Sequence, residues 1–120
     1  MNVTWRLMAM YLLIVVLVLL SSFVFGQNPC KKDICVVEFN ASWNESNSVD
    51  YLDKLTDCGV KRISIDEGDW QKDYNIVVVP TIIVFNGEEV ERFQADISFT
   101  IQAKLEEIQA IVDDIIMSDF

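Results

Sequence analysis

The segment Ile34-Cys35-Val36-Val37-Glu38-Phe39-Asn40-Ala41-Ser42-Trp43-Asn44-Glu45-Ser46-Asn47 carries the clearest evidence for the fold of this chain. Its first part, Ile34 to Phe39, is apolar except for Glu38, a pattern typical of a strand that is covered on both faces. The next part predicts an amphipathic helix over Glu45 to Asp57, because apolar residues recur there at helical spacing, at Val49, Leu52 and Leu55. Cys58-Gly59 then supplies a glycine stop.

The segment after this helix predicts a second strand and a short helical turn. Val60 to Asp66 alternates apolar and polar residues, and Glu67-Gly68-Asp69 breaks the alternation. Because a helix would connect the two strands, we expect them to run parallel. Trp70 to Asn75 is expected to form the helical turn.

A hairpin and a helix complete the prediction. Asn86-Gly87 lies between the expected strands Thr81 to Phe85 and Glu89 to Gln94, and Asn-Gly in this position is a strong hairpin pattern. From Ser98, a predicted N-cap, apolar residues recur as far as Ile116 and indicate a C-terminal helix of about 18 residues. The expected fold class is α/β, with a mixed sheet of about four strands and flanking helices.

The N-terminal segment has the pattern of an export signal. Met1 to Gly26 contains one charge, Arg6, followed by the unbroken apolar run Leu7 to Leu20 and a small residue suited to cleavage. We therefore predict a signal peptide over residues 1–26 and one exported domain, periplasmic or secreted, over residues 27–120. The alternative is an uncleaved anchor, because Leu7 to Phe25 is also about long enough to cross a bilayer.

The composition excludes several function classes. Nine Lys and Arg residues stand against nineteen Asp and Glu residues, a formal net charge of −10, which disfavours nucleic acid and anionic membrane surfaces as partners. We assign this acidic excess to solubility. The absence of histidine excludes triads of the Ser-His-Asp or Cys-His type and imidazole metal sites within one chain. No cofactor is expected, and a membrane is a partner only through residues 1–25 if the segment is not cleaved.

Three motifs between Ile34 and Ile116 resemble the thioredoxin family. They are the approach Phe39-Asn40-Ala41-Ser42-Trp43, the segment Tyr74-Asn75-Ile76-Val77-Val78-Val79-Pro80-Thr81, and the turn Val84-Phe85-Asn86-Gly87-Glu88. The resemblance implies a trimmed thioredoxin-like fold, because only Gln27 to Asp33 precede the first strand. It also implies a cis peptide bond before Pro80.

The same resemblance implies that the dithiol site is missing. Asn44 and Asn47 stand where the family has its two cysteines, one of which attacks as a thiolate while the other resolves the mixed disulfide. An amide side chain can do neither, so no catalytic residue is expected at these positions. Glu38 aligns with the family's buried acid and Arg62 with a nearby lysine. We expect these two residues to form an ion pair that serves folding, since buried charges are normally paired.

Peptide binding is the function that the resemblance still allows. In the family, the edge beside the cis-proline docks extended peptide through strand-like hydrogen bonds, which need no sulfur. Trp43, Val79, Pro80 and Ala95 would line this surface here. The alternative is that Trp43 and Val79 are ordinary surface and core residues. Ala95 departs from the family pattern, because a glycine usually stands there and lets the partner's backbone approach closely.

Three cysteines, Cys30, Cys35 and Cys58, leave the disulfide pairing open. We favour a structural bridge to Cys58 from either Cys35 or Cys30, because a small exported domain often gains stability in this way. The alternative is a relocated redox pair formed by Cys30 and Cys35, although their spacing does not match Cys-x-x-Cys. Three cysteines without a histidine do not complete a zinc site, so no metal is expected.

Three hypotheses follow from the sequence. The first is an exported, redox-inactive thioredoxin-like protein that binds another polypeptide or serves as an accessory module. The second is an atypical thiol-disulfide oxidoreductase that uses Cys30, Cys35 or Cys58. The third is a domain that its N-terminal segment displays at a membrane.

Overall fold

A computed structural model describes residues 3–21, 29–30 and 33–118 of the chain. Its elements are α1 (Val3–Ser21), β1 (Ile34–Asn40), η2 (Ser42–Asn47), η3 (Leu52–Lys54), β2 (Gly59–Ser64), α2 (Trp70–Asp73), β3 (Thr81–Asn86), β4 (Glu88–Gln94) and α3 (Leu105–Ser118), where η marks a 3-10 helix. The expected cleavage position after Gly26 lies outside these residues.

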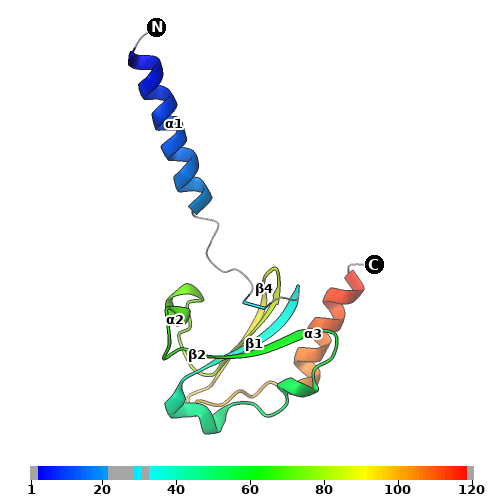
Figure 1. The fold of residues 1–120 in the computed structure, drawn as a ribbon. Helices are drawn as coiled ribbons and strands as arrows, with labels where there is room; N and C mark the ends of the chain where they lie inside the picture. The colour runs from blue at the N-terminus through cyan, green and yellow to red at the C-terminus, as the bar shows by residue number, and fades with distance from the viewer. Residues whose placement is uncertain (1–2, 22–28, 31–32, 119–120) are drawn as a thin grey trace.

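The four strands form one mixed sheet in the order β2-β1-β3-β4 (Figure 1). β1 pairs with β2 in parallel and with β3 antiparallel, and β3 and β4 form an antiparallel hairpin. β1 is central, as its sequence, apolar except for Glu38 between Ile34 and Phe39, predicts. Gly87 closes the hairpin with a φ of 77°, a left-handed conformation that favours glycine. The predicted mixed sheet of about four strands is confirmed.

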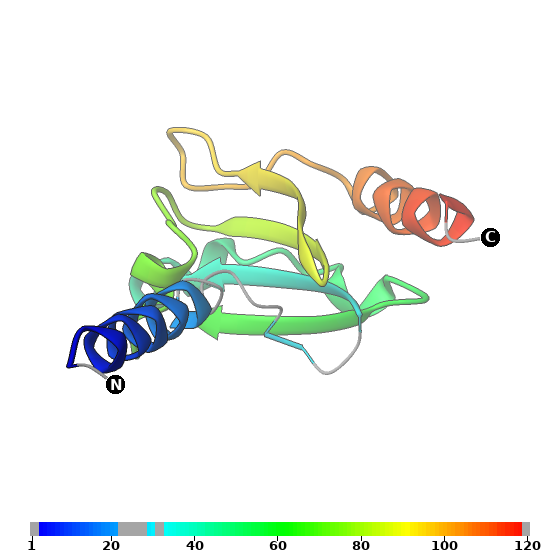
Figure 2. The same ribbon diagram turned by 90° about the horizontal axis from the view of Figure 1, so that it is seen from above.

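The core has two layers, one on each face of the sheet. Alternate residues of β1 divide between them: Cys35, Val37 and Phe39 belong to one cluster and Val36 to the other. The first cluster contains Tyr74 and Ile76 after α2, and the second contains the apolar side of α3 together with Leu52 and Leu55. Figures 1 and 2 accordingly show α2 and α3 on opposite sides of the sheet.

The predicted helix over Glu45 to Asp57 is wrong, because the chain forms the two short 3-10 helices η2 and η3 instead. Two side chains hold the Val49 backbone away from an α-helix: its N–H donates to Glu38 Oε2 at 2.8 Å, and its carbonyl accepts from Arg62 Nη2 at 2.7 Å. The apolar pattern was nevertheless informative, since Leu52 and Leu55 are buried.

The C-terminal helix begins at Leu105 and not at Ser98. Ser98 does not act as an N-cap, because its N–H and hydroxyl both donate to Asp96 Oδ1. The chain from Asp96 to Ala103 therefore forms an irregular segment before α3, which we call the 96–103 segment. The apolar side of α3 packs on the sheet through Ile108, Val112 and Ile115, as the periodicity predicts.

The N-terminal helix α1 exposes its side chains from Val3 to Val16. Within residues 3–21, 29–30 and 33–118, no helix meets the length and hydropathy that a membrane span requires.

Candidate functional site

Asn44 is buried, and its side chain makes hydrogen bonds through both the amide nitrogen and the amide oxygen. Its exposed fraction is 3%. Nδ2 donates to three oxygens, Asn40 Oδ1 at 3.1 Å, the Val79 carbonyl at 3.4 Å and the Phe99 carbonyl at 3.2 Å. Oδ1 accepts from Asn47 Nδ2 at 2.7 Å.

This amide therefore joins three parts of the chain. Asn40 ends β1, Val79 precedes Pro80 in a cis peptide bond, and Phe99 lies in the 96–103 segment. The two asparagine side chains bind each other, and that of Asn44 also binds the backbone. Neither side chain can form or break a bond to sulfur.

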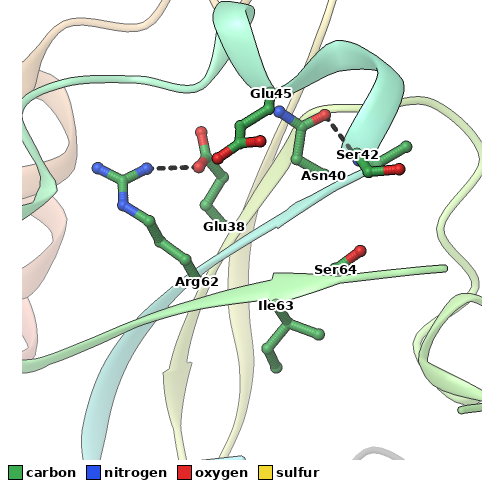
Figure 3. A pocket seen from close by; sticks show the side chains of 8 residues that line it. Glu38, Asn40, Ser42, Glu45, Arg62, Ile63 and Ser64 are labelled. Carbon is green, nitrogen blue, oxygen red and sulfur yellow. Dashed lines mark hydrogen bonds and ion pairs between the residues drawn. The ribbon is translucent and has the colours of Figure 1, made fainter. Parts of the chain in front are cut away.

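Glu38 and Arg62 lie side by side on β1 and β2, where they are paired in register. Arg62 Nη1 donates to Glu38 Oε1 at 2.5 Å (Figure 3). The Glu38 side chain is 1% exposed and that of Arg62 is 42% exposed, so the carboxylate is the buried partner. Together they line a polar depression of about 280 Å³ with Asn40, Ala41, Ser42, Glu45, Ile63 and Ser64.

The four residues expected to form a peptide-docking surface lie close together. Trp43 and Val79 line one depression of about 370 Å³. The Ala95 N–H donates to the Pro80 carbonyl at 3.1 Å, which fixes the chain after β4 beside the cis-proline. Trp43 is 66% exposed, whereas Val79 and Pro80 are buried. Of these three residues, Trp43 is therefore the one accessible from solvent, and Val79 and Pro80 lie beneath the surface.

Phe99 completes the depression, and sequence reasoning missed it. Its ring meets the Trp43 ring edge to face, with centroids 5.3 Å apart. Its backbone has a φ of 60°, which is unusual for an aromatic residue. One sequence pattern could have indicated an irregular segment around Phe99: the alternating polar residues Asp96, Ser98 and Thr100. Side chains of these types form hydrogen bonds with the local backbone and favour turns.

Two groups hold the 96–103 segment at its ends. Asp96 accepts hydrogen bonds from the Ser98 hydroxyl and N–H, and from Gln102 Nε2 at 2.9 Å. These bonds, led by that from the Ser98 side chain, lower the pKa of Asp96 below its ordinary value of 3.8. The Tyr51 hydroxyl donates to the Ala103 carbonyl at 2.6 Å. Burial, with added repulsion from Glu38, Glu107 and Asp50, raises the pKa of Tyr51 to about 12.

Acid is expected to loosen the 96–103 segment. Because the folded pKa of Asp96 lies below 3.8, its stabilising bonds are fully present above that pH and are lost as the pH falls through the folded value. The measurement is the NMR shift of the Phe99 ring protons between pH 6 and pH 2. Asp66 titrates in the same direction, so Asp96→Asn is the variant that separates the two. Identical titration of Phe99 in this variant would contradict the assignment to Asp96.

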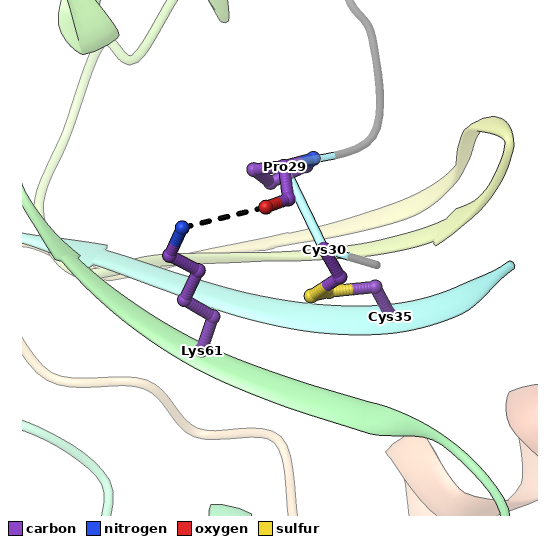
Figure 4. The surroundings of a disulfide bond; sticks show 4 residues. All are labelled: Pro29, Cys30, Cys35 and Lys61. Carbon is purple, nitrogen blue, oxygen red and sulfur yellow. Dashed lines mark hydrogen bonds between the residues drawn. A yellow bond between two sulfur atoms is a disulfide. The ribbon is translucent and has the colours of Figure 1, made fainter. Parts of the chain in front are cut away.

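The disulfide joins Cys30 to Cys35, with their Cα atoms 5.9 Å apart (Figure 4). The favoured bridge to Cys58 is therefore wrong. Cys35 belongs to the core cluster on the α2 face and Cys30 packs against it, whereas Cys58 packs against the cluster on the α3 face. Cys35 pairs in register with Gly59, the residue after Cys58, but the side chains of Cys35 and Cys58 belong to clusters on opposite faces of the sheet.

The bridge fixes the segment that leads into β1. Cys30 is half-buried and Cys35 is fully buried, so only one sulfur of the pair lies near solvent. Lys61 Nζ on β2 donates to the Pro29 carbonyl at 3.3 Å and holds the same segment (Figure 4). Among the described residues, no group of three or more metal-ligating side chains is present.

Comparison with known proteins supports the fold. No protein-family model and no curated protein sequence matches the chain. A mutant thioredoxin from Halobacterium salinarum superposes with a TM-score of 0.53 at 24% identity, covering 69% of this chain and 74% of its own. Thioredoxin-2 of the malaria parasite, a component of its protein secretion machinery, superposes with a TM-score of 0.51 at 18% identity, covering 75% and 95%.

Mitochondrial thioredoxin 3 from Saccharomyces cerevisiae gives a similar result, with a TM-score of 0.50, 16% identity, and coverage of 70% of this chain and 80% of its own. Superposition at such low sequence identity supports a shared fold, and it gives no information about shared active-site chemistry. Together with the strand order β2-β1-β3-β4 and the cis-proline, it shows that this chain has the thioredoxin-like fold.

Proposed function

We propose that this chain is an exported thioredoxin-like protein without dithiol chemistry, which binds another polypeptide beside Trp43 and Pro80. The observation that carries the proposal is the buried amide of Asn44, which donates to the Val79 and Phe99 carbonyls at the position where the resemblance would place a cysteine. What lies beside it is a depression in which Asp66 and Gln71 accompany apolar residues.

The depression suits an extended segment of a partner. Trp43, Val77 and Phe99 are large apolar residues that are 66%, 70% and 44% exposed, and all three line it. Exposed apolar residues that gather in one place, with polar residues around them, are typical of protein interaction sites. The Trp43 ring supplies the kind of rigid aromatic contact that dominates binding energy in such sites.

Export is supported by two independent features. The apolar run after Arg6 has the pattern of a signal peptide. The Cys30–Cys35 bridge is of a kind that persists in oxidising compartments outside the cytosol.

A second candidate is an unconventional thiol-disulfide oxidoreductase, which the Cys30–Cys35 bridge favours. Burial of Cys35 leaves Cys30 as the sulfur that a substrate thiolate would attack. The bridge also lies at the start of β1, while Asn44 follows the end of that strand. This candidate therefore requires a site different from the one that thioredoxins use.

The reduction potential of the bridge separates the two candidates. We expect the protein, equilibrated in glutathione redox buffers and alkylated for mass spectrometry, to keep the Cys30–Cys35 bridge down to about −300 mV, as structural disulfides do. Opening near −200 mV would support the oxidoreductase and contradict our first proposal.

Polypeptide binding is tested on an array of ten-residue peptides. We expect a subset to bind the protein and Trp43→Ala to weaken that binding about tenfold, because an aromatic contact is lost. Met117→Ala is the matched control, since Met117 is equally exposed but lies near the end of α3. The proposal is wrong if no peptide binds, or if Trp43→Ala binds every peptide as tightly as the unmodified protein.

A further inference from the structure

The depression beside Trp43 combines two perpendicular aromatic rings with a carboxylate. The planes of Trp43 and Phe99 meet at 86°, so their faces form a corner. Asp66 lines the same depression. Aromatic faces attract cations through the negative charge of their π-systems, and a nearby carboxylate adds to this attraction.

Asp66 is held in position by the residue that precedes Trp43. Its Oδ2 accepts from the Ser42 N–H at 2.8 Å and from the Ser64 hydroxyl at 3.3 Å. Hydrogen bonds from the Ser42 side chain and backbone lower the pKa of Asp66, so the carboxylate is ionised at neutral pH. Asp66 is exposed, so its carboxylate lies within reach of a ligand in the depression.

The third part of the depression is apolar. Val77 is 70% exposed and lies in the chain that leads to the cis-proline. A ligand that covers Val77 and reaches the corner needs an apolar stem and a cationic head. Lysine and arginine side chains have this form, because their methylene groups lie on apolar surface while the charge stays near water.

We propose that the corner formed by Trp43, Phe99 and Asp66 binds a lysine or arginine side chain of the partner polypeptide. This inference rests on the proposed function and adds the chemistry of the residue that is recognised. The net charge of −10 does not by itself identify a cationic partner, but it favours the approach of one to this corner.

The test uses the peptide array in matched pairs, with the full chain as the binding protein. One member of each pair carries a central lysine, and the other carries norleucine, which keeps the stem and removes the charge. We expect the lysine peptides to bind about tenfold more tightly, the combined effect of a partly exposed cation–π contact and an ion pair.

Three variants assign the preference to the corner. Asp66→Asn keeps the shape and the acceptor for Ser42, and Phe99→Leu and Trp43→Leu keep apolar bulk without a π face. Each is expected to reduce the lysine preference to about threefold or less. Glu91→Gln, which removes an exposed charge on β4, is the control and should leave the preference unchanged.

The outcomes distinguish this inference from the proposed function. If both members of each pair bind equally, the cation site is wrong while polypeptide binding stands. If no peptide binds, both are wrong. A lysine preference that Asp66→Asn and Phe99→Leu leave intact would also overturn the inference, because the cation would then bind elsewhere.

Discussion

Replacement of Arg62 by methionine is expected to lower the free energy of unfolding by about 3 kcal/mol. The reason is the burial of its partner: Glu38 is 1% exposed and would lose the cation that compensates its carboxylate. Arg62 also donates to the Val49 carbonyl at 2.7 Å, so the variant would loosen the chain between η2 and η3 as well.

The magnitude lies at the lower end of the range for a broken buried pair, which is about 3–5 kcal/mol. Glu38 borders the polar depression of about 280 Å³, and water that enters there would solvate part of its charge. Arg62 is 42% exposed, so its own desolvation adds little to the cost of forming the pair.

Urea unfolding monitored by circular dichroism measures the effect. Lys54→Met is the matched control, because Lys54 is an exposed cation on η3, and it should change stability by less than about 0.5 kcal/mol. Adding Glu38→Gln to Arg62→Met should recover stability, since a neutral amide still accepts from Val49 and no charge is left buried. If the double variant is less stable than Arg62→Met, charge burial is not the cause.

The strands were the predictable part of the fold because their residues carry the pattern locally. β1 and β3 are predominantly apolar, which is typical of strands at the centre of a sheet. The turn between β3 and β4 depends on Asn86-Gly87, where glycine adopts the left-handed conformation. None of these features needs a distant partner to be recognised.

The predicted helix over Glu45 to Asp57 is wrong because the spacing of its apolar residues fits two kinds of helix. Val49, Leu52 and Leu55 are spaced by three residues, which suits a 3-10 helix as well as an α-helix. Serine, asparagine and aspartate fill much of the remainder, and their side chains compete for backbone hydrogen bonds. The distant Glu38 and Arg62 then bind Val49 and fix the outcome.

The candidate site was predicted only in part for the same reason. Trp43 and Val79 were identified because they fall within motifs, and they do line one depression. Phe99 reaches that depression through a left-handed backbone and a hydrogen bond from Asn44, 55 residues away in sequence. No local pattern encodes such a contact.

Replacement of Asn44 by alanine is expected to destabilise the fold by about 2–3 kcal/mol. The variant removes the donor to the buried Val79 carbonyl and to the Phe99 carbonyl, and the acceptor for Asn47. A buried polar group that loses its partner costs about 1–3 kcal/mol, and part of this cost is relieved where water can reach Phe99. Asn47→Ala is the control: the half-buried Asn47 makes a single bond, so we expect a loss of about 0.5–1 kcal/mol.

Asn44→Asp sharpens the test because it keeps the size of the side chain but replaces the amide donor with a negatively charged acceptor. A carboxylate would face three oxygen acceptors, on Asn40, Val79 and Phe99, in a site that is 3% exposed. We therefore expect Asn44→Asp to be less stable than Asn44→Ala at pH 7 in urea unfolding, and to recover part of the difference at pH 4 as the carboxylate takes up a proton. Equal stability of the two variants at pH 7 would mean that the amide nitrogen of Asn44 does not hold the 96–103 segment beside the cis Val79–Pro80 bond. Phe99 would then not be held in place in the depression beside Trp43.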